Sequence, residues 1–154
     1  MLHATAVAID GNGVLLIGPS GSGKSDLALR LIDRGAVLIS DDAVELSVAG
    51  NQPMLAAAPN IAGKMEIRGV GICLVKSTNF APLRMVAELA NSVDRLPDDN
   101  LTTGLAGFDV PLLKLVPFEV SAAIKLEYAL RCVVDAGQWP VARIMPDKAE
   151  SMKN

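Results

Sequence analysis

Aromatic side chains are scarce in this sequence, which has three Phe, one Tyr and one Trp among 154 residues. The net charge is −3, and no block of basic residues is present. Nucleic-acid-binding proteins combine basic patches with aromatic groups that stack on bases, so this composition argues against nucleic acid as a partner. Hydrophobic residues still make up 51% of the chain, which predicts an aliphatic core of the kind found in α/β sheets.

Cysteines and long hydrophobic runs are also few. Cys73 and Cys132 form no C-x-x-C pattern and are expected to be reduced thiols, as in cytosolic proteins. No apolar run approaches about 20 residues, the length that a helix needs to span a bilayer, and no secretory signal is recognisable. We therefore expect a cytoplasmic protein without membrane contact. Its single domain is expected over residues 1–145, with a frayed polar tail over 146–154.

The strongest motif is a glycine-rich loop, GPSGSGKS, which fits the Walker A pattern G-x-x-x-x-G-K-[ST]. Its backbone N–H groups would point at phosphate oxygens. Lys24 would reach the β- and γ-phosphates of a nucleotide, and the hydroxyl of Ser25 would ligate Mg²⁺. The predicted nucleotide-binding residues are Gly18, Pro19, Ser20, Gly21, Ser22, Gly23, Lys24 and Ser25.

The segments beside this loop have the context that such a motif requires. An apolar run over 14–17 predicts a buried strand before the loop. An amphipathic run over 25–34, followed by Gly35, predicts a helix after it. Strand, loop and helix in this order aim a helix N-terminus at an anion.

Two neighbouring strands are expected around the loop strand. A first strand over 3–9 is joined to it by the turn at 10–13, whose sequence DGNG is typical of a β-hairpin. The apolar run over 36–40 is expected to lie beside the loop strand and parallel to it, because such crossovers are right-handed.

The rest of the chain completes the predicted fold class, an α/β protein with a P-loop-containing mixed β-sheet and flanking helices. Pro53 and Pro59 argue against a long regular element over 53–62. Further elements are expected as strands over 44–48 and 83–89, an exposed loop over 94–103, a proline-containing edge strand over 110–117, and a helix over 121–135 that ends at Gly137.

Asp41 and Asp42 follow the apolar run 36–40 and resemble a loose Walker B motif. Adjacent side chains of an extended segment point to opposite faces, so only one of the two carboxylates can face the phosphates. That carboxylate would hold Mg²⁺ through water or accept a proton from an incoming hydroxyl. The alternative is a solvated turn after a strand.

Glu66, Arg68 and His3 are further candidates. Glu66 and Arg68 are two residues apart, so in an extended segment they share one face and suit a Mg²⁺ and phosphate site. Periodicity alone also allows a surface ion pair before a glycine turn. His3 is the only histidine, and it is either an ordinary residue at a strand end or a catalytic imidazole.

Taken together, these residues resemble the catalytic domain of the bacterial HPr kinase/phosphorylase family. The resemblance is carried by the segments His3–Thr5, Gly18–Ser25, Leu38–Val44 and Met65–Ile72. The last of these, MEIRGVGI, is the specific part, because many enzymes share a phosphate loop. The chain begins at the family's histidine, so it is expected to lack the N-terminal domain that the family commonly carries.

The resemblance implies an ATP- and Mg²⁺-dependent kinase that phosphorylates a serine of HPr, the phosphocarrier of the sugar phosphotransferase system. In this reading Lys24 binds phosphate, Ser25 and Glu66 ligate the metal, and the pair Asp41-Asp42 supplies the base. His3 and Arg68 match an active-site histidine and arginine of the family. The resemblance also implies a homo-oligomer, a hexamer in the family.

One family feature is absent from the sequence. An arginine-containing loop that serves dephosphorylation precedes the last helix in the family, whereas residues 116–121 here read VPFEVS. Glu119 cannot replace a guanidinium on a phosphate, so we expect phosphorylase activity either to be lost or to have another basis. Two other interpretations stay open: a nucleotide sensor without transfer, and a small-metabolite kinase, although the latter usually needs an arginine-rich lid.

Overall fold

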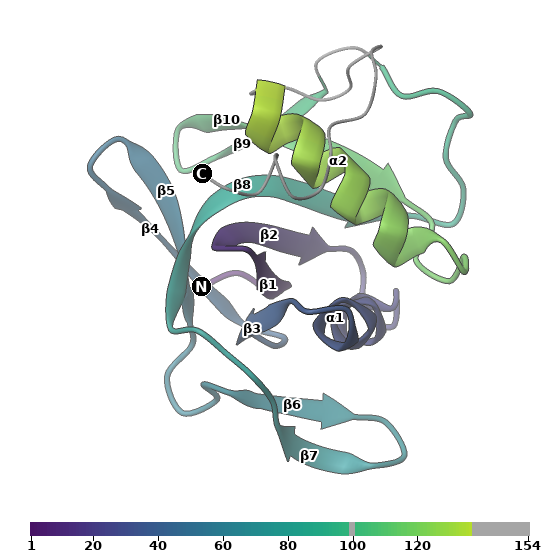
Figure 1. The fold of residues 1–154 in the computed structure, drawn as a ribbon. Coiled ribbons are helices and arrows are strands. Elements are labelled where there is room, and N and C mark those ends of the chain that lie inside the picture. The colour runs from purple at the N-terminus through teal and green to yellow at the C-terminus, as the bar shows by residue number, and fades with distance from the viewer. Residues whose placement is uncertain (99–100, 137–154) are drawn as a thin grey trace.

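A computed structural model of the protein describes residues 1–98 and 101–136 (Figure 1). The elements within these ranges are β1 (Thr5–Ile9), β2 (Asn12–Ile17), α1 (Lys24–Asp33), β3 (Val37–Ser40), β4 (Val44–Ala49), β5 (Gln52–Ala57), β6 (Lys64–Ile67), β7 (Gly71–Leu74), β8 (Phe80–Leu89), β9 (Thr102–Leu105), β10 (Phe108–Leu115) and α2 (Ala122–Ala136). The predicted end of the last helix at Gly137 and the predicted tail lie outside the described residues.

The main sheet is mixed, as the sequence predicts, and has eight strands among the described residues. Its principal path runs β3-β1-β2-β8-β10-β9, with β5 joining β8 and β4 joining β5. Strand β8 is parallel to β2 on one side and to β10 on the other, whereas the remaining pairs are antiparallel. The phosphate loop therefore leaves a strand that lies inside the sheet.

The β1–β2 hairpin is formed as predicted, with Asp10 and Gly11 at φ 50° and 81° in its turn. The predicted position of β3 is wrong in one respect. β3 pairs with β1, not with β2, because β1 and β8 already occupy the two edges of the loop strand. Since β3 and β2 are each antiparallel to β1, they still run in the same direction, as predicted.

Two proline-containing segments also differ from expectation. Residues 52–57 form a regular strand, β5, in which Pro53 pairs with β4 just before the part of β5 that pairs with β8. Strand β10 is not an edge strand, because β9 lies outside it and begins within the segment predicted to be a loop. Pro111 stands just before the part of β10 that pairs with β8, so the missing N–H removes no bond from that ladder.

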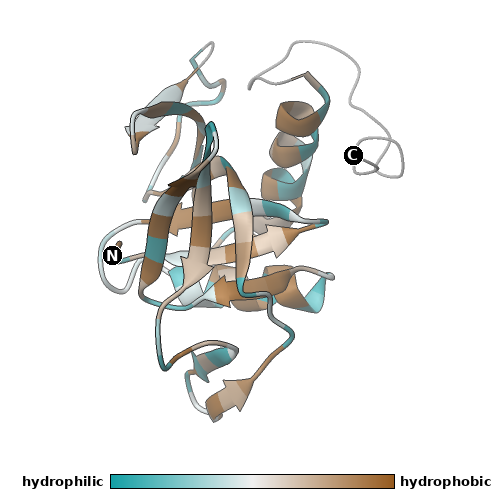
Figure 2. Ribbon diagram, turned by 90° about the vertical axis from the view of Figure 1, so that its left-hand side faces the viewer, coloured by the Kyte–Doolittle hydropathy of each residue, from teal (hydrophilic) through white to brown (hydrophobic). Residues whose placement is uncertain are grey.

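Both faces of the main sheet are buried. Helices α1 and α2 cover one face, where Leu27, Leu31, Leu126 and Leu130 pack in one cluster with strand residues such as Leu16. A second cluster, which includes Leu15, Ile39 and Leu55, fills the opposite face beneath the curled β4–β5 ribbon. The strands of this core are largely brown in Figure 2, which reflects their aliphatic composition.

An ion pair joins the two helices at the end of α1. Arg34 Nη2 lies 2.8 Å from Oε1 of Glu127, whose side chain is buried. The hydrogen bond and the opposite charge of Glu127 raise the pKa of Arg34 above its ordinary value. The pair therefore fixes α2, and the loop that precedes it, against the helix that follows the phosphate loop.

Strands β6 and β7 form a separate two-stranded hairpin below the main sheet (Figure 1). Met65 is buried and belongs to the core cluster that contains α1. Ile72 and Leu74, on the outer strand, are exposed. The hairpin thus contacts the body of the protein on one side only.

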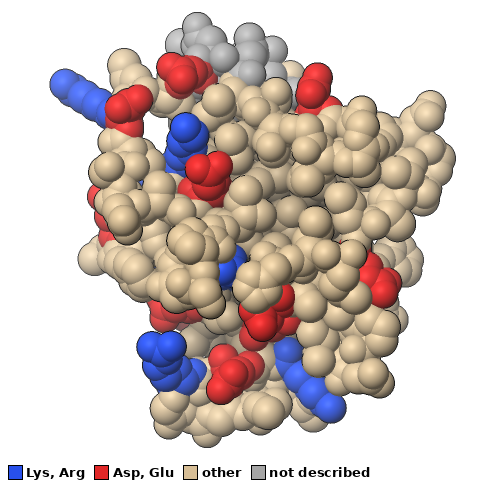
Figure 3. Space-filling view, turned by 180° about the vertical axis from the view of Figure 1, so that it is seen from behind, with Lys and Arg blue, Asp and Glu red and all other residues tan. Residues whose placement is uncertain are grey.

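The surface and the cysteines agree with the composition. On the face shown in Figure 3, Lys and Arg lie singly among acidic side chains. Cys73 and Cys132 do not form a disulfide. Within the described part of the chain, neither helix has the length and apolar character needed to cross a membrane.

Candidate active site

The phosphate loop connects β2 to α1. Within it, the Ser22 N–H donates a hydrogen bond to the Pro19 carbonyl at 3.0 Å. Gly23 precedes the first residue of α1 with φ 100°, a left-handed conformation that favours glycine. No described side chain caps this end of the helix, so its N–H groups are available to an anion. The local geometry is that of an anion-binding loop.

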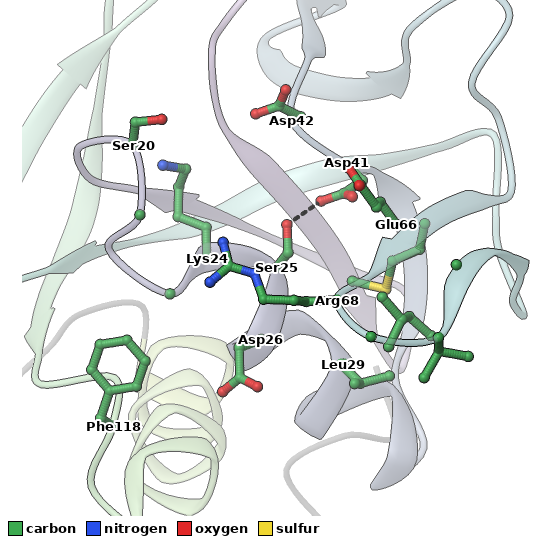
Figure 4. Close-up of a pocket in the computed structure, with 17 residues that line it drawn as sticks. Ser20, Lys24, Ser25, Asp26, Leu29, Asp41, Asp42, Glu66, Arg68 and Phe118 are labelled. Atoms are coloured by element: carbon green, nitrogen blue, oxygen red, sulfur yellow. Dashed lines mark hydrogen bonds between the residues drawn. The ribbon is translucent and has the colours of Figure 1, made fainter.

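Lys24 is the buried cation of this loop. Its ammonium group donates hydrogen bonds to the carbonyl oxygens of Gly18 at 2.8 Å and Pro19 at 3.0 Å. These bonds hold the amine over the loop, beside the position where phosphate oxygens would lie (Figure 4). The Ser22 hydroxyl is buried and has no hydrogen-bond partner within the described residues.

Asp41 is tied to the first residues of the helix. Its Oδ1 accepts hydrogen bonds from the Ser25 hydroxyl at 2.7 Å and from the Thr5 hydroxyl at 3.1 Å, and the residue is only 9% exposed. Asp41 therefore meets the loop although β3 is separated from β2 by β1. The hydroxyl of Thr5, on the intervening strand β1, bridges toward Asp41. In the sequence, Thr5 is marked only as the one hydroxyl residue of an apolar strand.

Asp42 points elsewhere, in agreement with the expectation that neighbouring carboxylates diverge. Its side chain is 74% exposed, and its Oδ1 lies 3.7 Å from Nδ1 of His3. The backbone is left-handed, with φ 67°, and the N–H donates to the Thr5 hydroxyl at 3.2 Å. One carboxylate is thus fixed against the loop, while the other is presented to solvent at its mouth.

The β6–β7 hairpin supplies the opposite wall. Glu66 leaves β6, and Arg68 leaves the turn after it, so that both line a cleft of about 840 Å³ together with the phosphate loop (Figure 4). Of the predicted site residues, Ser20, Gly21, Gly23, Lys24, Ser25, Asp41, Asp42, Glu66 and Arg68 line this cleft. Gly18, Pro19, Ser22 and His3 do not line it. The carbonyl groups of Gly18 and Pro19 accept hydrogen bonds from Lys24, Ser22 lies between two lining glycines, and His3 lies 3.7 Å from Asp42.

The oxygen donors around the cleft fit a magnesium ion that is shared with phosphate. No group of three or more His, Cys, Asp or Glu able to hold a metal occurs among the described residues. Mg²⁺ in phosphoryl-transfer sites instead uses one or two carboxylates, a hydroxyl and the substrate's phosphates. Ser25, Asp41 and Glu66 have this chemistry and face the same space.

Comparison with known proteins identifies the family to which these residues belong. Residues 1–126 match the HPr Serine kinase C-terminal domain. The chain is a member of this family. The HPr(Ser) kinase/phosphatase from Coxiella burnetii has the same fold, with a TM-score of 0.70 and 29% identity, over 81% of this chain and 83% of that one.

Two curated relatives give the extent of the similarity. The HPr kinase/phosphorylase of Chlorobium phaeobacteroides (strain BS1) is 36% identical over 126 residues, which cover 73% of this chain and 37% of that protein. The HPr kinase/phosphorylase of Chlorobium phaeovibrioides (strain DSM 265 / 1930) is 40% identical over 131 residues, which cover 75% and 39%. The chain therefore spans less than two fifths of the length of these relatives.

In this HPr kinase C-terminal domain, the loop 116–121 contributes a residue that sequence reasoning did not find. Phe118 lines the cleft beside Gly23, and a Cβ added to Gly23 would lie 2.9 Å from its ring. Glu119, by contrast, pairs with Lys125 at 3.0 Å. No periodicity or motif in this loop distinguishes Phe118 from its neighbours, so the sequence alone gave no reason to select it.

Proposed function

We propose that this protein is an ATP-dependent serine kinase that phosphorylates HPr. The observation that supports it best is the convergence of Lys24, Ser25, Asp41, Asp42 and Glu66 on one cleft, although they come from three separate segments. Phosphoryl transfer depends mostly on positioning and on electrostatic stabilisation of the transferred group, and these side chains supply both. The names of the relatives with the same domain support HPr as the substrate.

In this proposal the loop N–H groups and Lys24 bind the β- and γ-phosphates of ATP. Lys24 is held by two carbonyl groups, so little side-chain entropy is lost when it contacts phosphate. Arg68 faces the same space from the hairpin and would contact the transferred phosphoryl group. Ser25, Asp41 and Glu66 would hold Mg²⁺, which neutralises charge on the phosphates when bound.

Asp42 is the better candidate for the general base. The Asp41 carboxylate already accepts two hydroxyl hydrogen bonds, whereas Asp42 is exposed where a serine of a protein substrate would approach. Asp42 would accept the hydroxyl proton as the serine oxygen bonds to the γ-phosphorus and ADP leaves. His3, next to Asp42, would act as a positioning residue for that carboxylate.

The direct test incubates the protein with labelled ATP, Mg²⁺ and HPr, and follows acid-stable phosphate on serine. Asp42→Asn is expected to lower transfer by about 10²- to 10⁴-fold while ATP still binds. Asp41→Asn is expected to raise the Mg²⁺ concentration needed for transfer. Asp94→Asn is the matched control, because Asp94 lies on an exposed loop outside the cleft. Transfer by Asp42→Asn at the parent rate would refute the base assignment.

A second candidate function is a nucleotide sensor without transfer. The loop 116–121 favours it, because it reads VPFEVS and lacks the arginine that the family resemblance leads us to expect there. ATP binding without any labelled serine would support the sensor. We also propose that dephosphorylation is not retained, and phosphate release from serine-phosphorylated HPr would contradict this.

The cellular setting is proposed from the cysteine usage and the sequence composition, and the assembly from the family resemblance. We propose a cytoplasmic protein that assembles with copies of itself. Its domain would end near residue 145. Light scattering after gel filtration measures the assembly, and a monomer at micromolar concentration would contradict it.

A further inference from the structure

Phe118 is an exposed aromatic side chain in a chain with few aromatics. It is 69% exposed, although burial of a phenylalanine is normally favourable. The ring is not an isolated surface group, because it lines the cleft and lies against Gly23 at the start of α1. One part of the ring contacts the phosphate loop, and the rest faces open space.

The backbone on both sides of Phe118 is held in place. Arg30, one turn before the end of α1, donates hydrogen bonds to the carbonyl oxygens of Pro117 and Glu119. Arg30 is itself paired with Asp26 at 3.1 Å, and Glu119 is paired with Lys125. The ring is therefore presented by a fixed loop, so little conformational entropy is lost when a ligand packs on it.

The position of the ring relates it to one part of a nucleotide. Figure 4 places Phe118 on one side of Lys24, and Asp41 and Glu66 on the other. If the metal and the γ-phosphate lie beside the carboxylates, the chain of phosphates runs across the loop toward Phe118. The group at the far end of a nucleoside triphosphate is its base.

We propose that Phe118 forms the platform on which the base of the bound nucleotide stacks. The proposal rests on the proposed nucleotide-binding function and extends it to the base. Every nucleobase has a π-face, so a stacking platform gives affinity without strong discrimination between bases. ATP and GTP are therefore expected to bind with similar affinity and to depend on Phe118 to a similar extent.

The test compares a ligand that has a base with one that lacks it. Binding of ATP and of inorganic triphosphate is measured by calorimetry with Mg²⁺ for the parent and for Phe118→Ala. Loss of one stacking contact is expected to weaken ATP binding by about 5- to 150-fold and to leave triphosphate binding unchanged. Phe118→Tyr is expected to keep the affinity for ATP.

Val120→Ala is the matched control, because Val120 is in the same loop, is 99% exposed and does not line the cleft. If Phe118→Ala weakened the binding of ATP and of triphosphate equally, the ring would only shape the phosphate loop, and the proposal would be overturned. Unchanged ATP binding would also overturn it. A parent protein that binds neither ligand would refute the nucleotide site itself, a separate result.

Discussion

The central strands and the β6–β7 hairpin carry opposite walls of one cleft, yet they are stabilised in different ways. All five residues of β1 are buried, whereas Met65 alone is buried in the two four-residue strands of the hairpin. Glu66 and Arg68 nevertheless depend on that hairpin for their positions. The comparison indicates that folding free energy is concentrated in the sheet, while the wall with Glu66 and Arg68 is anchored mainly by Met65, with Ile67 partly buried beside it.

The largest effect on stability is expected from a cavity in the main sheet. Leu16→Ala removes a fully buried side chain of β2 that packs beneath both helices. The free energy of unfolding is expected to fall by about 3–5 kcal/mol, from a total of about 5–15 kcal/mol for a domain. Urea unfolding measures the change, and a loss below about 1 kcal/mol would contradict this account of the core.

A smaller and more local effect is expected at the hairpin. Met65→Ala removes its buried contact with the core, at a cost of about 2 kcal/mol. Hydrogen exchange is expected to quicken in residues 64–74 while the amides of β1 and β2 stay protected. Phosphoryl transfer should fall with it, because Glu66 and Arg68 lose their support. Uniform acceleration across the chain would show that the hairpin is not a separate unit.

The wall of the cleft that the main sheet supports is tested by Thr5→Val, which removes one hydroxyl and keeps the shape of the side chain. The hydroxyl donates to Asp41 and accepts from the Asp42 N–H, so that N–H loses its partner. A loss of about 1–2 kcal/mol is expected, with a smaller loss of transfer than in Asp42→Asn. Unfolding and transfer measured together provide the check, and an unchanged free energy of unfolding would argue against this network.

The smallest effect is expected from Leu74→Ala, the same substitution as Leu16→Ala but on the outer strand of the hairpin. Leu74 is 81% exposed, so its removal leaves no cavity. The free energy of unfolding is expected to change by less than about 0.5 kcal/mol. A large loss in the urea experiment would mean that this strand is covered in solution.

The sequence predicted those parts of the molecule that depend on local chemistry. The loop Gly18–Ser25 and the β1–β2 hairpin are specified by residues that are neighbours in the chain, and both are present. That one carboxylate of the pair Asp41-Asp42 faces the phosphate loop was also predicted, but from the wrong pairing of β3 and without identifying it as Asp41. A polar contact across an intervening strand depends on the small side chain of Thr5, which periodicity does not reveal.

Other features depend on long-range packing and were missed for that reason. Proline, which has no backbone N–H, is excluded from a strand only at positions where the ladder needs that donor. Distant segments decide which edge of a strand is paired, and so which positions these are. Pro53 and Pro111 therefore misled the prediction of β5 and β10. Phe118 is close to Gly23 because Arg30 holds the loop after β10, and no local pattern encodes that contact.

The left-handed backbone of Asp42 limits which replacements can report on its charge. Alanine is strained at φ 67°, so a loss of activity in Asp42→Ala would combine a change of backbone conformation with the loss of the carboxylate. Asparagine and glycine accept that conformation. A library of substitutions at this position would therefore contain some residues that tolerate a left-handed backbone and some that can accept a proton. Aspartate has both properties.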